Sequence, residues 1–255
     1  MKLRLSIIAA LSMGLFYASC KTSEEPTSDD YDDIAAGVAA IVAGDQGSDT
    51  ESMQDAVLLS DGETPEGLST ANLQGSSAGT RGSLNYSYEV HCTDFQGNLL
   101  DICDAEITDF AEISVNWDGN INTERYDATV SRDGNWTLSN LQGDTVLFNG
   151  EGSFYLESSF TGLFLQTTRT FIFDYLATYE NVSYERSSGL FVDGTATFDI
   201  RAERTRSNAF SDVEAEFNVM AVITFQSDGN ASIVLDGKRS YQLNTATATL
   251  TLATE

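Results

Sequence analysis

Cysteines, a single histidine and a group of arginines are the residues of this chain whose chemistry could mark a site. Cys92 and Cys103 flank a polar stretch that contains Gln96-Gly97-Asn98, and in an oxidising compartment this spacing favours a disulfide across the mouth of a hairpin. Closing so short a loop stabilises a fold by roughly 3 kcal/mol. A metal site is disfavoured, because only His91 lies nearby and no Cys-x-x-Cys motif is present. We therefore expect no metal site and no cofactor.

Two features could indicate catalysis. Gly75-Ser76-Ser77-Ala78-Gly79 matches the letters of the Gly-x-Ser-x-Gly nucleophile motif, but that motif needs a buried strand before it and a helix after it, whereas a linker is expected here. His91 lies on the polar face of an expected strand, which favours a solvent-facing residue beside a disulfide over a general base. We expect no enzyme. A carboxylate-dependent hydrolase remains the second alternative, because the 39 acids offer pairs that the sequence cannot single out.

The densest basic cluster is formed by Arg201, Arg204 and Arg206, with Glu203 between them. Three guanidinium groups could clamp an anionic ligand, which makes them candidate anion-binding residues. Pairing with acids on neighbouring strands is favoured, because the chain has 39 acidic residues and 13 Lys plus Arg. Asp-Gly-Asn segments offer oxygen ligands for calcium, but turn formation alone accounts for them.

Composition narrows the classes of partner. The chain has 255 residues and a net charge of −26, and its length permits one large or two small domains. Such a charge argues against a nucleic-acid binder, because no basic patch is present to displace counterions. It argues equally against docking on anionic lipid through protein charge.

The N-terminus has the pattern of a secretory signal peptide over residues 1–19. Lys2 and Arg4 precede an apolar run over residues 6–17, and small residues follow. The run is shorter than the roughly 20 residues needed to span a bilayer.

Tyr17-Ala18-Ser19-Cys20 resembles the lipobox of bacterial lipoproteins. The resemblance implies that Cys20 becomes the lipid-modified N-terminus and that the protein is anchored in a membrane through this lipid. Lys21, in place of Asp, implies the bacterial outer membrane, with the protein facing the periplasm or the cell surface. The alternative is ordinary secretion, with Cys20 as a packed residue of the apolar region.

Residues 20–81 predict a flexible acidic tether. The segment is rich in acids and contains a single aromatic residue, Tyr31, which is a composition typical of disorder. Acids before an Ala-rich run predict one short helix over residues 31–43. Gly and Ser over residues 75–82 predict a final hinge.

Residues 82–255 predict an all-β domain. Apolar and polar residues alternate with period two in runs such as 84–92, 196–202 and 213–225, and no helical stretch interrupts them. We expect an antiparallel meander of roughly ten to twelve strands, several about 10–13 residues long, that forms a barrel or a strongly curved sheet. Alternation also predicts a strand over residues 246–252. Asp-Gly pairs predict tight turns at residues 118–120, 133–135, 193–194, 228–230 and 236–237.

One face of these strands is aromatic and should form the core, and in a wide barrel it could also line an apolar cavity. We expect an exported, lipid-anchored cell-envelope protein that acts as a non-enzymatic binding or structural module. The main alternative is a carrier of a lipid or other apolar ligand. The expected partners are the membrane, through the lipid, and an envelope or extracellular ligand, but not nucleic acid. The predicted aromatic face consists of Tyr86, Tyr88, Trp117, Phe154, Phe160, Phe198, Phe217 and Phe225.

Residues 79–255 as a whole resemble a group of acidic bacterial lipoproteins. The resemblance implies an architecture and a location, and it brings no activity with it. It rests on strand and turn features: residues 79–82, the Cys92/Cys103 pair, and residues 135–138, 148–154 and 202–205.

Overall fold

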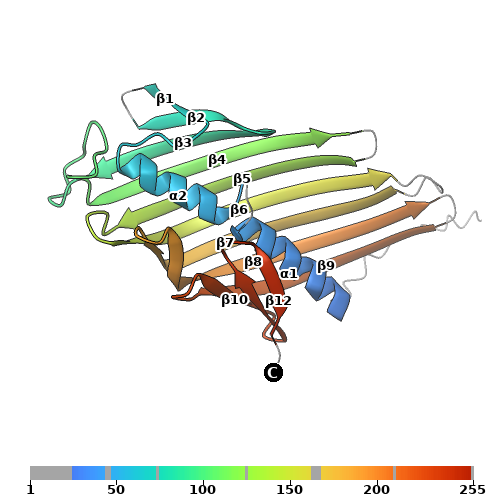
Figure 1. Cartoon of the computed structure of the whole chain (residues 1–255). Helices are drawn as coiled ribbons and strands as arrows, with labels where there is room; N and C mark the ends of the chain where they lie inside the picture. The colour runs from blue at the N-terminus through green and yellow to red at the C-terminus, as the bar shows by residue number, and fades with distance from the viewer. Residues whose placement is uncertain are drawn as a thin grey trace, which may run out of the picture.

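The computed structural model describes residues 25–43, 47–72, 75–123, 126–161, 168–208 and 211–253, so Cys20 and the signal-peptide segment lie outside the described residues. Within these residues, two helices precede one antiparallel sheet in which twelve strands follow each other in sequence order (Figure 1). The predicted all-β meander is confirmed. The elements are α1 (Ser28–Ala43), α2 (Asp49–Ser60), β1 (Leu68–Asn72), β2 (Ser76–Arg81), β3 (Leu84–Thr93), β4 (Phe110–Asn122), β5 (Tyr126–Ser139), β6 (Thr145–Thr161), β7 (Thr168–Glu185), β8 (Leu190–Asn208), β9 (Ser211–Phe225), β10 (Asn230–Leu235), β11 (Arg239–Asn244) and β12 (Thr249–Leu252).

The sheet is open. Its order runs from β1 at one edge to β12 at the other, and no ladder within the described residues joins these two strands. Of the two shapes expected, a barrel or a strongly curved sheet, the open strand order excludes the barrel for the described residues. Its central strands are longer than expected, with 18 residues in β7 and 19 in β8.

Alternation sorts the side chains onto an inner and an outer face. In β3, buried Tyr86, Tyr88 and Val90 alternate with exposed polar residues. The expected aromatic face is buried except for Phe160, which lies near the end of β6 and is 48% exposed. Residues 246–252 depart from the expected strand. Residues 245–248 form a turn, and the short edge strand β12 leaves Leu252 exposed.

The expectation of a flexible tether over residues 20–81 is corrected by the structure. Helices α1 and α2 lie across the inner face of the sheet, α1 near β10–β12 and α2 near β3 and β4 (Figure 1). The helix expected over 31–43 is present and begins at Ser28, whereas α2, β1 and β2 were not expected. Val38 and Met53 are buried in the same cluster as the inner face of the sheet. Few aromatic residues are needed in a segment that packs onto an aromatic face supplied by the sheet.

Neither helix in the described part of the chain is long and apolar enough to cross a membrane.

Two of the five Asp-Gly turns are confirmed. Residues 228–229 lie in the connection from β9 to β10, and residues 236–237 lie in the connection from β10 to β11. Both connections contain a glycine with positive φ, +73° at Gly229 and +65° at Gly237. These are the short hairpins for which the Asp-Gly signal is specific.

The remaining Asp-Gly sites lie inside strands. Residues 118–120 belong to β4, 133–135 to β5 and 193–194 to β8. Gly119 and Gly134 lie on the inner face, where a Cβ atom would come within 2.5 Å of Leu84 and 2.9 Å of Trp136. These two glycines make room for core side chains, while the neighbouring Asp and Asn point to solvent.

Candidate functional site

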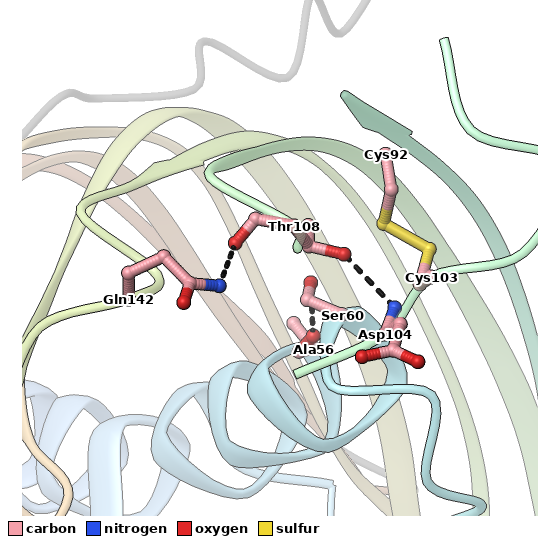
Figure 2. Close-up of a disulfide and its surroundings, with 7 residues drawn as sticks. All are labelled: Ala56, Ser60, Cys92, Cys103, Asp104, Thr108 and Gln142. Carbon is pink, nitrogen blue, oxygen red and sulfur yellow. Dashed lines mark hydrogen bonds between the residues drawn. A yellow bond between two sulfur atoms is a disulfide. The ribbon is translucent and has the colours of Figure 1, made fainter. Parts of the chain in front are cut away.

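A long connection between β3 and β4, residues 94–109, stands out on the surface, and we call it the disulfide loop. Cys92, near the end of β3, is joined to Cys103 by a disulfide with a Cα–Cα distance of 5.5 Å (Figure 2). The backbone N–H of Leu100 donates to the carbonyl of Cys92, and Leu99 pairs with Thr93. The first half of the loop is therefore a small hairpin closed at its mouth by the expected disulfide.

The tip of this small hairpin has a defined conformation. The Asp94 carboxylate accepts hydrogen bonds from the backbone N–H groups of Gln96 and Asn98, at 2.8 and 2.9 Å, and from the Asn98 side-chain amide at 2.9 Å. These bonds, with the side chain of Asn98 as the largest contributor, hold the pKa of Asp94 below its ordinary value. Phe95 is held in this turn and is 79% exposed.

The second half of the loop is fixed to the turn between β5 and β6. The backbone N–H of Asp104 donates to the Thr108 hydroxyl at 2.9 Å (Figure 2). The Gln142 side-chain amide donates to the carbonyls of Thr108 and Ala105, at 2.7 and 2.9 Å. Thr108 is buried beneath these contacts.

The end of α2 holds the loop from a third side. Gly62 has a φ of +79°, and a Cβ atom there would come within 2.4 Å of the Cys103 carbonyl oxygen, so this close approach requires glycine. The backbone N–H of Ala105 donates to the carbonyl of Asp61, whose carboxylate pairs with Arg186 in the turn after β7. A helix missed by sequence reasoning is therefore one support of the loop.

Although its backbone is fixed, the disulfide loop exposes large apolar side chains. Phe95, Leu99, Ile102 and Ile107 are 79%, 72%, 62% and 51% exposed. Isolated exposed apolar residues are common on protein surfaces, whereas these four lie on one loop with a braced backbone.

The loop and β3 border an open pocket of about 580 Å³, which we call the loop pocket. Glu89 and His91 lie on its wall with their side chains exposed, 3.2 Å apart between carboxylate oxygen and Nε2. His91 thus lies where expected, solvent-facing beside the disulfide. The residues that line the loop pocket are Gly75, Glu89, Val90, His91, Leu99, Leu100, Asp101, Ile102 and Cys103.

The arginine cluster does not form an anion clamp in the described structure. Arg201 is surrounded by acids, with its guanidinium nitrogens 2.9 Å from Glu216 and from Glu203. Arg204 lies 2.8 Å from Asp30 of α1. The side chain of Arg206 lies outside the described part of the chain. Pairing with acids, the favoured alternative, is what the structure shows for Arg201 and Arg204.

The sequence reasoning missed a buried polar cluster beneath α2. Arg132 of β5 lies on the inner face, 1% exposed, with its guanidinium 2.7 Å from the Asp49 carboxylate. The hydroxyls of Tyr175 and Tyr179 donate to the same carboxylate. Burial raises the pKa of Asp49, and the charge of Arg132 opposes this shift. The sequence does contain a signal for this burial. Arg132 lies at an even position, like the apolar residues that alternate over residues 126–138, so its side chain belongs on the same face of the strand.

A second buried contact joins α2 to the sheet edge. Asp55 accepts two hydrogen bonds from the guanidinium of Arg81, at 2.7 and 3.0 Å, and one from the Tyr88 hydroxyl at 2.9 Å. Both buried carboxylates of α2 are thus committed to arginine and tyrosine partners, so the cluster holds the helix to the sheet.

In comparisons with protein families, curated proteins and solved structures, the chain has no match.

Proposed function

We propose that this protein is an exported, lipid-anchored cell-envelope protein that acts as a non-enzymatic binding module through its disulfide loop. The observation that carries the proposal is the contrast between a braced backbone and exposed apolar side chains. The Cys92–Cys103 disulfide and the Gln142 amide fix the loop, while Phe95 and Leu99 remain more than two-thirds exposed, at 79% and 72%.

Rigidity matters because ordering a loop costs free energy when a partner binds. A loop ordered during folding avoids that cost, so more of the contact free energy contributes to affinity. Apolar area withdrawn from water contributes about 25 cal/mol per Å², so a partner that covers these side chains gains binding free energy. A connection with only a structural role would have no need of four exposed apolar residues.

The main alternative expected from sequence was a carrier that holds an apolar ligand against the inner face. In the structure, α1 and α2 occupy that face, and side chains such as Ile34 and Met53 are buried against it. A carboxylate-dependent hydrolase would use converging acids in a cleft, whereas Asp49 and Asp55 are paired with arginine and tyrosine. The disulfide loop is therefore the surface on which we base the function.

The contact can be tested by photo-crosslinking in cells that produce the protein. A photo-reactive amino acid at Leu99 or Ile102 is expected to give crosslinked species. The same amino acid at Leu176 or Met220 is not, although these side chains on the outer face of β7 and β9 are 68% and 48% exposed. Equal crosslinking at all four positions, or none at the loop, would contradict the proposal.

The lipid anchor is tested separately. Cys20→Ser removes the thiol that would carry the lipid, and the protein is expected to move from the membrane fraction to the soluble fraction. Cys103→Ser is the control, because it changes a cysteine outside the lipobox and should leave the protein in the membrane fraction. Continued membrane association of the Cys20→Ser protein would refute the anchor and leave the loop proposal untouched.

A further inference from the structure

The loop pocket combines apolar walls with uncompensated negative charge. Leu99 and Ile102 supply apolar surface, and Glu89 and Asp101 supply carboxylates. We infer that this pocket accepts the lysine or arginine side chain of a basic, apolar segment on a partner protein. The inference rests on the proposed function, because it names the partner of the same loop.

Charge is the first step of the argument. Residues 82–124 contain nine acidic residues and no lysine or arginine. In the part of the chain that the structure describes, Asp101 has no hydrogen-bond or ion-pair partner, and the contact of Glu89 is with His91. Elsewhere the chain pairs its arginines with acids, as at Arg81 and Arg201, so the loop pocket is a place where negative charge remains available.

Shape and polarity are the second step. A lysine or arginine side chain has an apolar stem and a charged head, and it lies along apolar surface while its head stays in polar surroundings. Leu99 and Ile102 fit the stem, and Glu89 and Asp101 fit the head. A volume of about 580 Å³ is ample for one such side chain and its apolar neighbours.

Two other occupants are disfavoured by the same charge. An anionic lipid surface attracts basic segments and repels acidic ones, so the loop is unsuited to a phospholipid headgroup layer. A second copy of this chain carries a net charge of −26 as well and would be repelled at long range. A basic protein segment is attracted by charge and also contacts the exposed apolar residues.

The test uses the intact, oxidised protein and labelled peptides in a fluorescence anisotropy titration. The probe is a short peptide of lysine and leucine. One control peptide replaces each lysine by glutamate and another replaces each leucine by serine. Binding is expected for the lysine–leucine peptide, and both controls are expected to bind much more weakly. Salt should weaken the binding, because the charges are exposed.

Matched variants locate the site. Glu89→Gln with Asp101→Asn is expected to weaken binding of the lysine–leucine peptide about fivefold to tenfold. Asp118→Asn with Asp199→Asn removes the same charge from other exposed positions and should leave affinity within about twofold. All four changes lie on exposed side chains, and circular dichroism checks that each variant is folded.

Each outcome decides something. Equal affinity of the two double variants, or binding of the glutamate peptide, overturns the inference while crosslinking at Leu99 can still support the proposed function. Preferential binding of vesicles containing phosphatidylglycerol overturns it in favour of a membrane contact. Self-association that Leu99→Ser abolishes overturns it in favour of a second copy. Loss of crosslinking at Leu99 in cells refutes the proposed function itself.

Discussion

At the scale of single residues, the contact between Arg132 and Asp49 shows how a charge is kept inside this protein. Removing two charges from water costs several kcal/mol, and the cost is recovered only with good geometry and further hydrogen bonds. The 2.7 Å ion pair, the hydroxyls of Tyr175 and Tyr179, and the indole ring of Trp136 beside the guanidinium supply part of these interactions, while Nε and Nη2 of Arg132 are buried without a hydrogen-bond partner among the described residues. The pair links the first residue of α2 to the middle of β5.

Breaking this pair from either side should destabilise the fold strongly. Arg132→Met leaves the Asp49 carboxylate buried without its cation, and Asp49→Asn leaves the guanidinium without its anion. Each is expected to lower the free energy of unfolding by about 3–5 kcal/mol, measured by urea denaturation. The double variant should lose less than the sum of the two.

The control for this prediction is Arg201→Gln on the outer face. Arg201 also contacts acids, but its side chain is 40% exposed, so its loss should cost less than about 1 kcal/mol. Additive effects of Arg132→Met and Asp49→Asn would show that the two residues act independently, contrary to the prediction.

At the scale of elements, strands were predictable where one face of the strand is buried and the other is exposed to solvent. The alternation over residues 84–92 gives β3, and the alternation over residues 213–225 gives most of β9. Turns were less predictable, because Asp-Gly also occurs inside long strands. At Gly134, the missing side chain makes room for Trp136, and the aspartate before it lies on the outer face. Local sequence cannot separate this use of glycine from a turn.

Helix α2 was unpredictable for a different physical reason. Its buried face includes Asp49, Ser52 and Asp55, which read as solvent-facing residues in a segment already rich in acids. Asp49 and Asp55 are buried because they form ion pairs with Arg132 and Arg81, which lie on strands of the sheet and not in the helix itself. Helix α1 buries Ala, Ile and Val in a recognisable run, and its helix was expected.

The candidate site was predictable in part. The spacing of Cys92 and Cys103 gave the disulfide, and the polarity of β3 placed His91 in solvent. The exposure of Leu99 and Ile102 could not be foreseen, because an apolar residue in a loop is as easily buried beneath it. The tertiary supports of their loop, at Gln142 and Gly62, come from distant parts of the chain.

At the scale of the whole molecule, the helices are attached to the sheet through tyrosine hydroxyls. The pKa of Tyr31, Tyr86 and Tyr241 is raised to about 12. Burial is the larger cause, and contacts with carboxylates add to it. Tyr31 of α1 donates to Asp236, and Tyr241 of β11 donates to Asp32 of α1. Burial raises the pKa values of Tyr88, Tyr175 and Tyr179 well above 10. Deprotonating these hydroxyls would place a negative charge beside an existing one on both helices.

The sign of the pH dependence follows from these shifts. A tyrosine has a pKa of about 10 in the unfolded chain, so below pH 10 both the folded and the unfolded chain hold their phenolic protons. In that range the tyrosines contribute no pH dependence to the free energy of unfolding. Between pH 10 and 12 the unfolded chain releases protons that the folded chain retains. The free energy of unfolding must therefore fall as pH rises through this range.

Tyrosinate absorbance measures the titration of the tyrosines, and denaturant unfolding at each pH measures the free energy of unfolding. In the folded protein the buried tyrosines should titrate late and cooperatively, as α1 and α2 separate from the sheet. In guanidinium chloride the tyrosines should all titrate near pH 10. Tyr86→Phe removes one titrating group and should make the fall in stability between pH 10 and 12 less steep. Native tyrosines that all titrate near pH 10 would mean that the helices do not depend on these protonated hydroxyls for their attachment.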